Sequence, residues 1–475
     1  MSHAPAPSLY AAREPVFPRR VRGRFRRLKW WVMAATLGLY YVLPWLRWDR
    51  GEGRPDQAVL VDLAGRRFFF FFVEIWPQDF HVVAGLLVMA GLGLFLFTSV
   101  LGRVWCGYAC PQTVWTDLFL LTERWVEGDR NARLRLWHAP WSLAKARLRL
   151  AKWAIWLVIA LATGGAWVFY FADAPTLLAG LVTGTAPPVA YTTVAVLTAT
   201  TVAFGGFARE QICIYACPWP RIQSALTDEE TLTIGYRAWR GEPRGKASAR
   251  GADAPPPGDC VDCRACAAVC PMGIDIRDGQ QLACITCALC IDACDDVMTR
   301  LGRPRGLIGY FTLTDERAER AGRPPRPVRQ HVLRPRTILY ATLWSLAGAL
   351  LLAALALRAP LDLDVSPVRN PVFITLSDGT IRNAYDLRLR NKSGETRDLA
   401  LSVQGDASLA LSVEGHPDGI VTVPADATAS VRLYLDAPPG SPAATGGRTP
   451  LRLVLADPAA DLGASADTHF TGKAP

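Results

Sequence analysis

Five apolar stretches, each nearly free of charged residues, dominate the pattern of hydrophobic and polar positions along the chain. They run from 30 to 46, 81 to 101, 153 to 172, 189 to 207 and 338 to 357. A helix needs about 20 apolar residues to cross the hydrocarbon core of a bilayer. A buried soluble helix could explain one such stretch but not five. The pattern therefore predicts a five-span α-helical membrane bundle. The first stretch lacks a small-residue cleavage site, so we expect an anchor and not a removed signal peptide.

A different pattern begins after the last apolar stretch. Polar and apolar side chains alternate in short runs at 384–391, 399–403, 409–413, 420–423, 431–435 and 451–455. Gly, Pro, Asn and Asp separate these runs, which is typical of an all-β, Ig-like sandwich. The region contains no cysteine, so the Ig disulfide is lacking. Nothing in it looks catalytic, and we expect a structural or partner-docking role.

Charge then orients the predicted spans. The net charge is +10, and the excess of Lys and Arg falls before the first span, between the second and third, and in 209–336. Cytoplasmic loops carry such an excess, so these segments are predicted to lie inside. The segment 173–188 has no Lys or Arg, and 48–80 balances its arginines with acidic residues. Both should lie outside. Topology and attraction to anionic lipids explain the net charge, so no nucleic-acid partner is expected.

These patterns predict a multi-pass protein of a bacterial inner membrane with a cytoplasmic N-terminus. Its predicted parts are a basic segment (1–28), a four-span membrane domain (29–208), a cytoplasmic region (209–336) with its core at 255–300, a fifth span (337–358) and a periplasmic β-domain (362–475).

Eight of the twelve cysteines lie in two matched runs. The runs are Cys260-x2-Cys263-x2-Cys266-x3-Cys270-Pro271 and Cys284-x2-Cys287-x2-Cys290-x3-Cys294. This spacing is typical of a bacterial ferredoxin with two [4Fe-4S] clusters, in which the fourth cysteine of each run binds the other cluster. The predicted iron ligands are Cys260, Cys263, Cys266 and Cys294 for one cluster and Cys284, Cys287, Cys290 and Cys270 for the other. Zinc ribbons or a disulfide knot would not need two matched runs of four. The chain is therefore predicted to transfer single electrons.

The other four cysteines form a repeated CxxxCP motif, with Tyr-Ala before the second cysteine each time. Cys106 and Cys110 end the second span, and Cys213 and Cys217 end the fourth. The repeat suggests a duplicated two-span unit that places the motifs side by side. Spacing i, i+4 on a helix would put each pair on one face. Two pairs could build a four-thiolate pocket, which would favour Cu(I), zinc or iron-sulfur chemistry. Packing cysteines are the plainer alternative, because free cysteine is often buried.

Several motifs together make the chain resemble the CcoG/FixG/RdxA family of cytochrome oxidase accessory proteins over nearly its whole length. Besides both cysteine runs and both CxxxCP motifs, the residues that carry the resemblance are Glu74-Ile75-Trp76-Pro77-Gln78, Glu123-Arg124-Trp125-Val126-Glu127-Gly128-Asp129-Arg130-Asn131 and Arg240-Gly241-Glu242-Pro243-Arg244-Gly245. One departure is Asp295, which follows Cys294 where many ferredoxins have proline; it removes no ligand.

The resemblance implies a cupric reductase, an oxidoreductase that reduces Cu(II) to Cu(I) for assembly of the cbb-type oxidase. Its partners would be copper ions, oxidase assembly factors or copper chaperones, and the lipid bilayer. Cys106, Cys110, Cys213 and Cys217 would then meet copper or relay its electron. Soft sulfur ligands also keep copper as Cu(I).

The electron donor and the oligomeric state, a homodimer included, stay open. No Gly-x-Gly-x-x-Gly follows a strand, so a nicotinamide or flavin site is unsupported. No Cys-x-x-Cys-His motif for c-type haem occurs. His81 is the histidine beside a span, where an interfacial position is the plainer expectation and a metal-ligand role the alternative.

Two other functions remain open. A quinol-linked electron-transfer subunit would share the four spans, CxxxCP motifs and ferredoxin module, but the fifth span and β-domain count against it. In a non-enzymatic copper-binding scaffold, the clusters would only stabilise the fold. Two adjacent clusters are more than such a structural role requires, which favours electron transfer.

Overall fold

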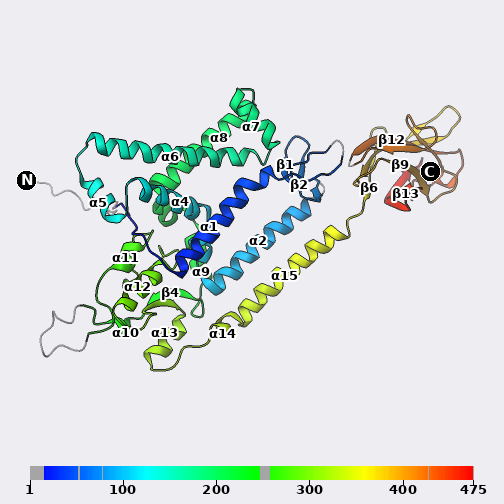
Figure 1. Ribbon diagram of the computed structural model, residues 1–475. Coiled ribbons are helices and arrows are strands. Elements are labelled where there is room, and N and C mark those ends of the chain that lie inside the picture. The colour runs from blue at the N-terminus through cyan, green and yellow to red at the C-terminus, as the bar shows by residue number, and fades with distance from the viewer. Residues whose placement is uncertain (1–14, 52–53, 77–78, 246–256, 426, 474–475) are drawn as a thin grey trace, which may run out of the picture. The chain divides into compact units, whose positions relative to one another are not determined.

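The computed structural model describes residues 15–51, 54–76, 79–245, 257–425 and 427–473. The chain divides into two compact units, Met1–Leu351 and Leu352–Pro475. Figure 1 shows long helices and a group of short helices and strands, α10 to α13 with β4, in the first unit and mostly strands in the second. Pro77 and Gln78 of the family motif lie outside the described residues, as do the first 14 residues of the predicted basic segment. Residues 255–256, at the start of the predicted ferredoxin core, also lie outside them.

Within the described residues, four helices are long and apolar enough to cross a membrane. They are α2 (Phe80–Leu101), α6 (Leu143–Val168), α8 with its π-helical continuation η3 (Pro188–Ala208) and α15 (Pro335–Ala356). These four helices overlap the second to fifth predicted stretches. The first stretch falls on α1 (Arg24–Val42) and the 3-10 turn η1 (Leu43–Trp45). Helix α1 begins with four cations in six residues, so it is too highly charged to be counted with the other four. The prediction of five spans therefore stays a prediction.

Local sequence explains where α6 begins and where α7, one of the helices between the spans, begins and ends. Ser142 caps α6 by accepting a hydrogen bond from the backbone of Lys145, so the helix starts ten residues before the predicted apolar stretch. Asp173 caps α7 (Ala174–Thr183), which sequence analysis missed, and Gly184 ends it in the left-handed conformation. The connecting helices are α3 (Val104–Tyr108), α4 (Pro111–Val126), α5 (Arg130–His138), the π-helical η4 (Ile212–Ala216) and α9 (Trp219–Leu226).

Two small antiparallel sheets also belong to the first unit. One joins β1 (Val59–Asp62), β2 (Arg67–Phe70) and β3 (Val73–Ile75) between α1 and α2. The other pairs β4 (Thr233–Tyr236) with β5 (Ile308–Phe311). Because β4 precedes the cysteine runs and β5 follows them, this pair closes the module that carries them. The helices of this region are α10 (Ala238–Gly241), α11 (Ala265–Val269), η6 (Ile276–Asp278), α12 (Leu289–Arg300), α13 (Leu313–Arg320) and α14 (Val328–Val332).

The cysteine-bearing module is attached to the first residues of α1. The carboxylate of Asp292, in α12, accepts hydrogen bonds from the backbone N–H groups of Phe25 at 3.3 Å and Arg26 at 2.8 Å. Asp292 thus caps the N-terminus of α1, a role that a residue adjacent to the helix in sequence usually has. Its negative charge interacts favourably with the positive end of the helix dipole. Gly23 is required there, because a Cβ at this position would overlap the Asp292 carboxyl group.

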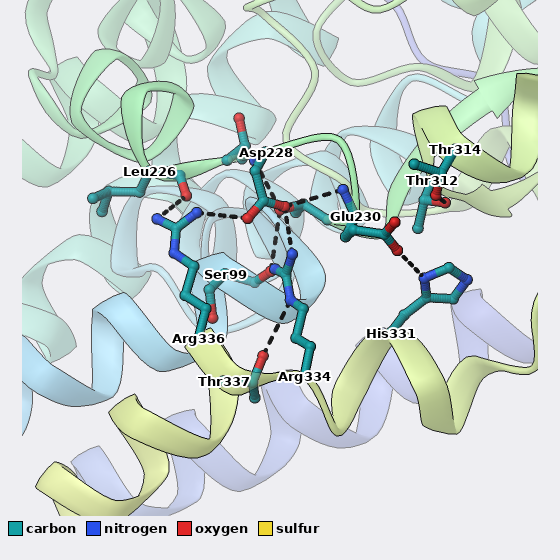
Figure 2. A network of polar contacts seen from close by, with 12 residues as sticks. Ser99, Leu226, Asp228, Glu230, Thr312, Thr314, His331, Arg334, Arg336 and Thr337 are labelled. Atoms are coloured by element: carbon teal, nitrogen blue, oxygen red, sulfur yellow. Dashed lines mark hydrogen bonds and ion pairs between the residues drawn. The ribbon is translucent and has the colours of Figure 1, made fainter.

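A polar network attaches the start of α15 to the same unit (Figure 2). Asp228 accepts hydrogen bonds from Arg334 and Arg336, each at 2.6 Å. Burial alone would raise the pKa of Asp228, but the two guanidinium groups hold this pKa below its usual range. The buried His331 lies between Glu230, at 2.7 Å, and Asp315, at 2.9 Å. This network fixes the polypeptide immediately before the apolar part of α15.

The second unit is a sandwich of two antiparallel sheets around one hydrophobic core. One sheet has the order β10-β12-β8-β6, with β7 beside β8; the other has the order β11-β9-β13-β14. Its strands are β6 (Leu361–Pro367), β7 (Ile374–Thr375), β8 (Ile381–Asn391), β9 (Arg397–Gln404), β10 (Ala410–Val413), β11 (Ile420–Val423), β12 (Thr428–Ala437), β13 (Arg448–Asp457) and β14 (Leu462–Thr471). Tyr385 in β8 donates a hydrogen bond to His469 O in β14, which joins the sheets.

The alternation that predicted this sandwich is visible in its core. Leu387 and Leu389 in β8 and Leu433 and Leu435 in β12 are almost fully buried, and the residues between them face outward. All six predicted runs lie in or overlap observed strands. Strands β6, β7 and β14 were not predicted. The segment Leu462–Thr471 of β14 consists mostly of small and polar residues, so its inward-facing and outward-facing positions differ little in hydrophobicity.

Gly23→Ala should lower the stability of the first unit, since the new methyl group would displace the Asp292 cap. Loss of an N-cap costs about 1 kcal/mol of stability. Thermal unfolding of the purified protein would measure this loss as a lower midpoint temperature. Gly38→Ala is the matched control, because this glycine lies in α1 itself and a Cβ there meets nothing within 4 Å. We expect a lower midpoint for Gly23→Ala and an unchanged or higher one for Gly38→Ala. Equal midpoints would contradict the capping role of Asp292.

Candidate redox and metal site

The two cysteine runs line two separate cavities in the module. Lining the first are Cys260, Cys263, Cys266 and Cys294. Lining the second are Cys270, Cys284, Cys287 and Cys290, and Cys266 lines both cavities. The fourth cysteine of each run thus faces the cavity of the other run. This is the exchange that the spacing predicts for two [4Fe-4S] clusters. Apolar residues, such as Ile234 and Ile276 at the second cavity, complete the lining.

The backbone around both cavities repeats an unusual conformation at matching positions. Asp262 and Arg264, which flank Cys263, have φ near +53°. Thr286 and Ala288, which flank Cys287, have φ of +57° and +61°. Left-handed residues in such turns direct successive N–H groups inward and form anion-binding nests. Backbone hydrogen bonds from Met272 and Ile274 to the sulfur of Cys270 add to them. The residues present therefore fit anionic iron-sulfur clusters.

The fourth cysteines differ in their local structure. Cys270 precedes Pro271, has an extended backbone with ψ of 121°, and ends the short helix α11. Cys294 precedes Asp295, and α12 continues through it to Arg300. Because Asp295, unlike proline, has a backbone N–H, the helix can continue past Cys294. Asp295 accepts a hydrogen bond from Gly306 N at 2.9 Å and so fixes the chain that leads into β5.

A buried arginine lies beside the first cavity. The Arg277 guanidinium donates to Asp262 and Asp275, each at 2.6 Å, and approaches the sulfur of Cys260 at 4.0 Å. This guanidinium also holds the pKa of the Asp262 and Asp275 carboxyl groups below their usual range. Arg277 thus places a fixed positive charge next to a predicted ligand. Sequence analysis did not identify it, since its three partners are recognisable only after folding.

The CxxxCP motifs do not form the single helical face that their spacing predicts. Cys106 lies in α3, which ends at Tyr108, and Cys110 is the extended residue before α4, with ψ of 130°. In the second motif, Cys213 lies in η4 and Cys217 follows it with ψ of 126°. The i, i+4 helical arrangement was therefore wrong. A residue before proline is driven out of the α-helical region, and both motifs place their second cysteine there.

The first CxxxCP motif packs directly on the second cysteine run. A Cβ on Gly107 would lie 2.6 Å from Ile285 O and 3.0 Å from the Cα of Cys287, so only glycine permits this approach. The Tyr108 hydroxyl donates to Cys287 O at 3.2 Å. Cys106 and Cys213 both pack against the hydrophobic cluster that contains Cys287. The structure thus brings the thiols of Cys106 and Cys213 to residues that line the second cavity, such as Ile285 and Cys287.

Arg103 and Gln223 complete the surroundings of the thiols. Arg103 is 7% exposed and donates a hydrogen bond to Leu282 O, just before the second run. Cys106 donates to the Gln223 side chain at 3.1 Å. Burial raises the pKa of Cys106 to about 11, although the nearby Arg103 opposes this rise. Burial likewise raises the pKa of Cys213 to about 12. A soft metal ion would therefore displace protons on binding these thiols.

The four CxxxCP thiols are neighbours but do not surround one point. Cys213 lies within electrostatic range of the other three, and Cys106 within range of Cys110 and Cys217. Yet in the described part of the chain no three Cys, His, Asp or Glu side chains are placed to hold one metal ion. The predicted four-thiolate pocket is thus not preformed. Cluster ligands are a different case, because each of them binds its own iron atom of a cubane. His81 is exposed at the start of α2.

Three family models match the chain. A model described as a 4Fe-4S dicluster domain matches residues 208–313, and one described as a 4Fe-4S binding domain matches residues 82–128. A model described as an IG-like fold at the C-terminal of FixG matches residues 351–473. Residues 82–128 contain only Cys106 and Cys110, so this segment alone cannot supply four cysteine ligands.

Curated relatives are similar over almost the full length. Protein RdxB of Cereibacter sphaeroides is 67% identical and covers 98% of both chains. Protein RdxA of the same organism is 65% identical, covering 94% of this chain and 95% of its own. Nitrogen fixation protein FixG of Rhizobium meliloti is 54% identical, covering 91% and 88%.

The fold and the cysteine cavities define a membrane iron-sulfur protein with ferredoxin-type 4Fe-4S domains and a C-terminal Ig-like domain. Identity over almost the whole length then places it more narrowly: the chain belongs to the FixG/RdxA family.

Gly107→Ala should separate the first CxxxCP motif from the second cysteine run, since its methyl group would collide with backbone that cannot rotate away. Hydrogen exchange measured by mass spectrometry should then show weaker protection of the amides between 282 and 290. Gly91→Ala serves as the control, because a Cβ at this position in α2 meets nothing within 4 Å. Unchanged protection in Gly107→Ala would show that the contact is not tight in solution.

Proposed function

We propose that this protein reduces Cu(II) to Cu(I) for the assembly of a cbb-type cytochrome oxidase. One observation carries the proposal. The side chains of Cys106 and Cys213 pack against the hydrophobic residues around Cys287. Their thiols are soft groups of the kind that bind copper. A one-electron donor and a copper-binding group would thus be neighbours.

The iron ligands in this proposal are the cysteines that line the two cavities. Cys260, Cys263, Cys266 and Cys294 would hold one [4Fe-4S] cluster, and Cys270, Cys284, Cys287 and Cys290 the other. When bound, the clusters supply one electron at a time, as the change from Cu(II) to Cu(I) requires. The chain's own part is to exclude water with apolar residues and to direct backbone N–H groups inward at the left-handed positions.

Copper is the substrate in this proposal and not a resident cofactor. Thiolates favour Cu(I) over Cu(II), so Cys106, Cys110, Cys213 and Cys217 would hold the product better than the reactant. Because these four thiols do not surround one point, the site would have to close around the ion. Arg103 would offset the negative charge that the thiols gain on losing their protons. A loose site suits an ion that must be passed on to assembly factors or copper chaperones.

The proposed setting is a bacterial inner membrane. The N-terminus and the cysteine-bearing module would lie in the cytoplasm, and the Ig-like domain in the periplasm. Loop charge supports this orientation, because arginine is frequent on the module side and the segment 173–188 has neither Lys nor Arg. A reducing cytoplasm also suits exposed cluster ligands such as Cys263.

Copper reduction is tested by adding Cu(II) to anaerobic protein whose clusters were reduced with dithionite and freed of excess reductant. Electron paramagnetic resonance would follow cluster oxidation, while a chromogenic chelator measures Cu(I). We expect one Cu(I) for each cluster oxidised. A variant with Cys106, Cys110, Cys213 and Cys217 all changed to Ser should form Cu(I) at least about tenfold more slowly, because it lacks soft ligands.

Iron and sulfide analysis of both proteins controls this experiment. Two [4Fe-4S] clusters give about eight irons per chain, and the Ser variant should match the parent. Clusters that stay reduced in excess Cu(II) would contradict the proposal and favour a partner protein or a scaffold role. About twelve irons in the parent and eight in the variant would instead assign the CxxxCP thiols to a third cluster. Rapid reduction of the clusters by a quinol, with no effect of copper, would favour the quinol-linked function.

A further inference from the structure

A large cavity lies between the basic beginning of α1 and the helix α4. It has a volume of about 800 Å³, within the size range of ligand pockets. The described residues that line it are Arg20, Val21, Arg22, Gly23, Arg26, Arg27, Trp30, Leu121, Arg124 and Trp125. Five of these ten are arginines and none is acidic. No cysteine contributes to it, so the cavity is separate from the redox site.

Two of the arginines carry buried nitrogens that no described residue satisfies. Arg26 is 5% exposed; its Nη1 donates to both oxygens of Asp117 at 2.9 Å, whereas its Nη2 has no hydrogen-bond partner among the described residues. Arg124 donates through Nη2 to Pro18 O at 3.3 Å, and its buried Nε has no such partner. A buried donor left unsatisfied costs free energy, more so when charged, so negative charge close to these two side chains would stabilise both of them.

The charges around the cavity also favour an anion. Burial lowers the pKa of Arg124, and the neighbouring Arg26 lowers it further, although Asp117, Asp129 and Glu123 act in the opposite direction. The two guanidinium groups therefore repel each other. An anion bound beside them would offset this repulsion. Phosphate groups match the planar geometry of guanidinium donors well.

Apolar residues at the cavity point to a lipid as the source of this phosphate. Trp125 is 78% exposed and Leu121 39% exposed at the lining, and Trp31 on the next turn of α1 is 76% exposed. Exposed tryptophans next to arginines are typical of the level of lipid headgroups in a membrane. The apolar part of α1 begins at Trp30. A soluble anion would gain nothing from these side chains, whereas acyl chains would cover them.

We propose that this cavity binds the phosphate headgroup of an anionic phospholipid of the surrounding bilayer. The site lies between two helices that adjoin the cysteine-bearing segments. Its α1 wall is capped by Asp292 from the cysteine-bearing module, and its α4 wall follows directly on Cys110. The bound lipid thus stabilises the attachment of the module to the membrane. The inference does not depend on copper as the substrate.

Native mass spectrometry of the whole, cluster-loaded protein in a neutral detergent tests the proposal, with dioleoyl phosphatidylglycerol as the probe. Arg22→Gln/Arg27→Gln removes two exposed arginines of the cavity and should leave the fold intact. We expect about tenfold weaker binding of phosphatidylglycerol in this variant, because each surface arginine contributes to anionic-lipid attraction. Arg135→Gln/Arg147→Gln has the same charge change at exposed positions outside the cavity and should bind as the parent does.

Two further arms identify the ligand. Dioleoyl phosphatidylcholine, whose headgroup has no net charge, should bind at least about tenfold more weakly than phosphatidylglycerol and equally in all variants. Inorganic phosphate at millimolar concentration should not displace the lipid. Equal binding of phosphatidylglycerol by both double variants would overturn the cavity as its site. Displacement by phosphate, lost with the Arg22 and Arg27 substitutions, would overturn the lipid and assign a soluble anion.

Discussion

The close backbone contact between Gly107 and the second cysteine run is the constraint on which the rest of the first unit depends. The two backbones can meet here because residue 107 has no side chain; a Cβ on it would lie 2.6 Å from Ile285 O. This contact brings Cys106 beside the cluster of residues around Cys287. The Asp292 cap on α1 and the β4–β5 pair then hold the module from other sides. Without the contact, the membrane-face thiols and the ferredoxin-type module would be separate sites.

Proline gives the cysteine motifs a common local structure. Cys110, Cys217 and Cys270 each precede a proline and are all extended. An extended residue directs its side chain away from the preceding helix, so the cysteine can reach a partner from another segment. Cys294 lacks the proline and reaches its cavity from within the helix α12. The extended Cys270 and the helical Cys294 thus both reach the cavity lined by the other run, as the exchange of ligands between the two runs requires.

The sequence predicts well those features that depend on spacing within one segment. The apolar stretch at 81–101 gives α2 almost to the residue, and the alternation around Leu387 gives β8. The grouping of eight cysteines follows from their spacing, and the cavities repeat it. Features that need two distant segments were missed. Strands β4 and β5 are four residues each and 71 residues apart, and neither has a pattern that identifies its partner.

The same limit applies to charged residues, whose roles depend on what folding places beside them. A count of arginines predicts which segments face the cytoplasm, and for that purpose every arginine is equivalent. The structure distinguishes them: Arg103 lies near Cys106 and Cys213, Arg277 beside Cys260, and Arg26 between Asp117 and an open cavity. A buried cation is costly unless something offsets its charge. Asp117 offsets the charge of Arg26, and Asp262 and Asp275 offset that of Arg277, whereas Arg103 donates to a backbone carbonyl and lies near the Cys106 thiol. Thiolates formed beside Arg103 would supply the negative charge that this arginine otherwise lacks.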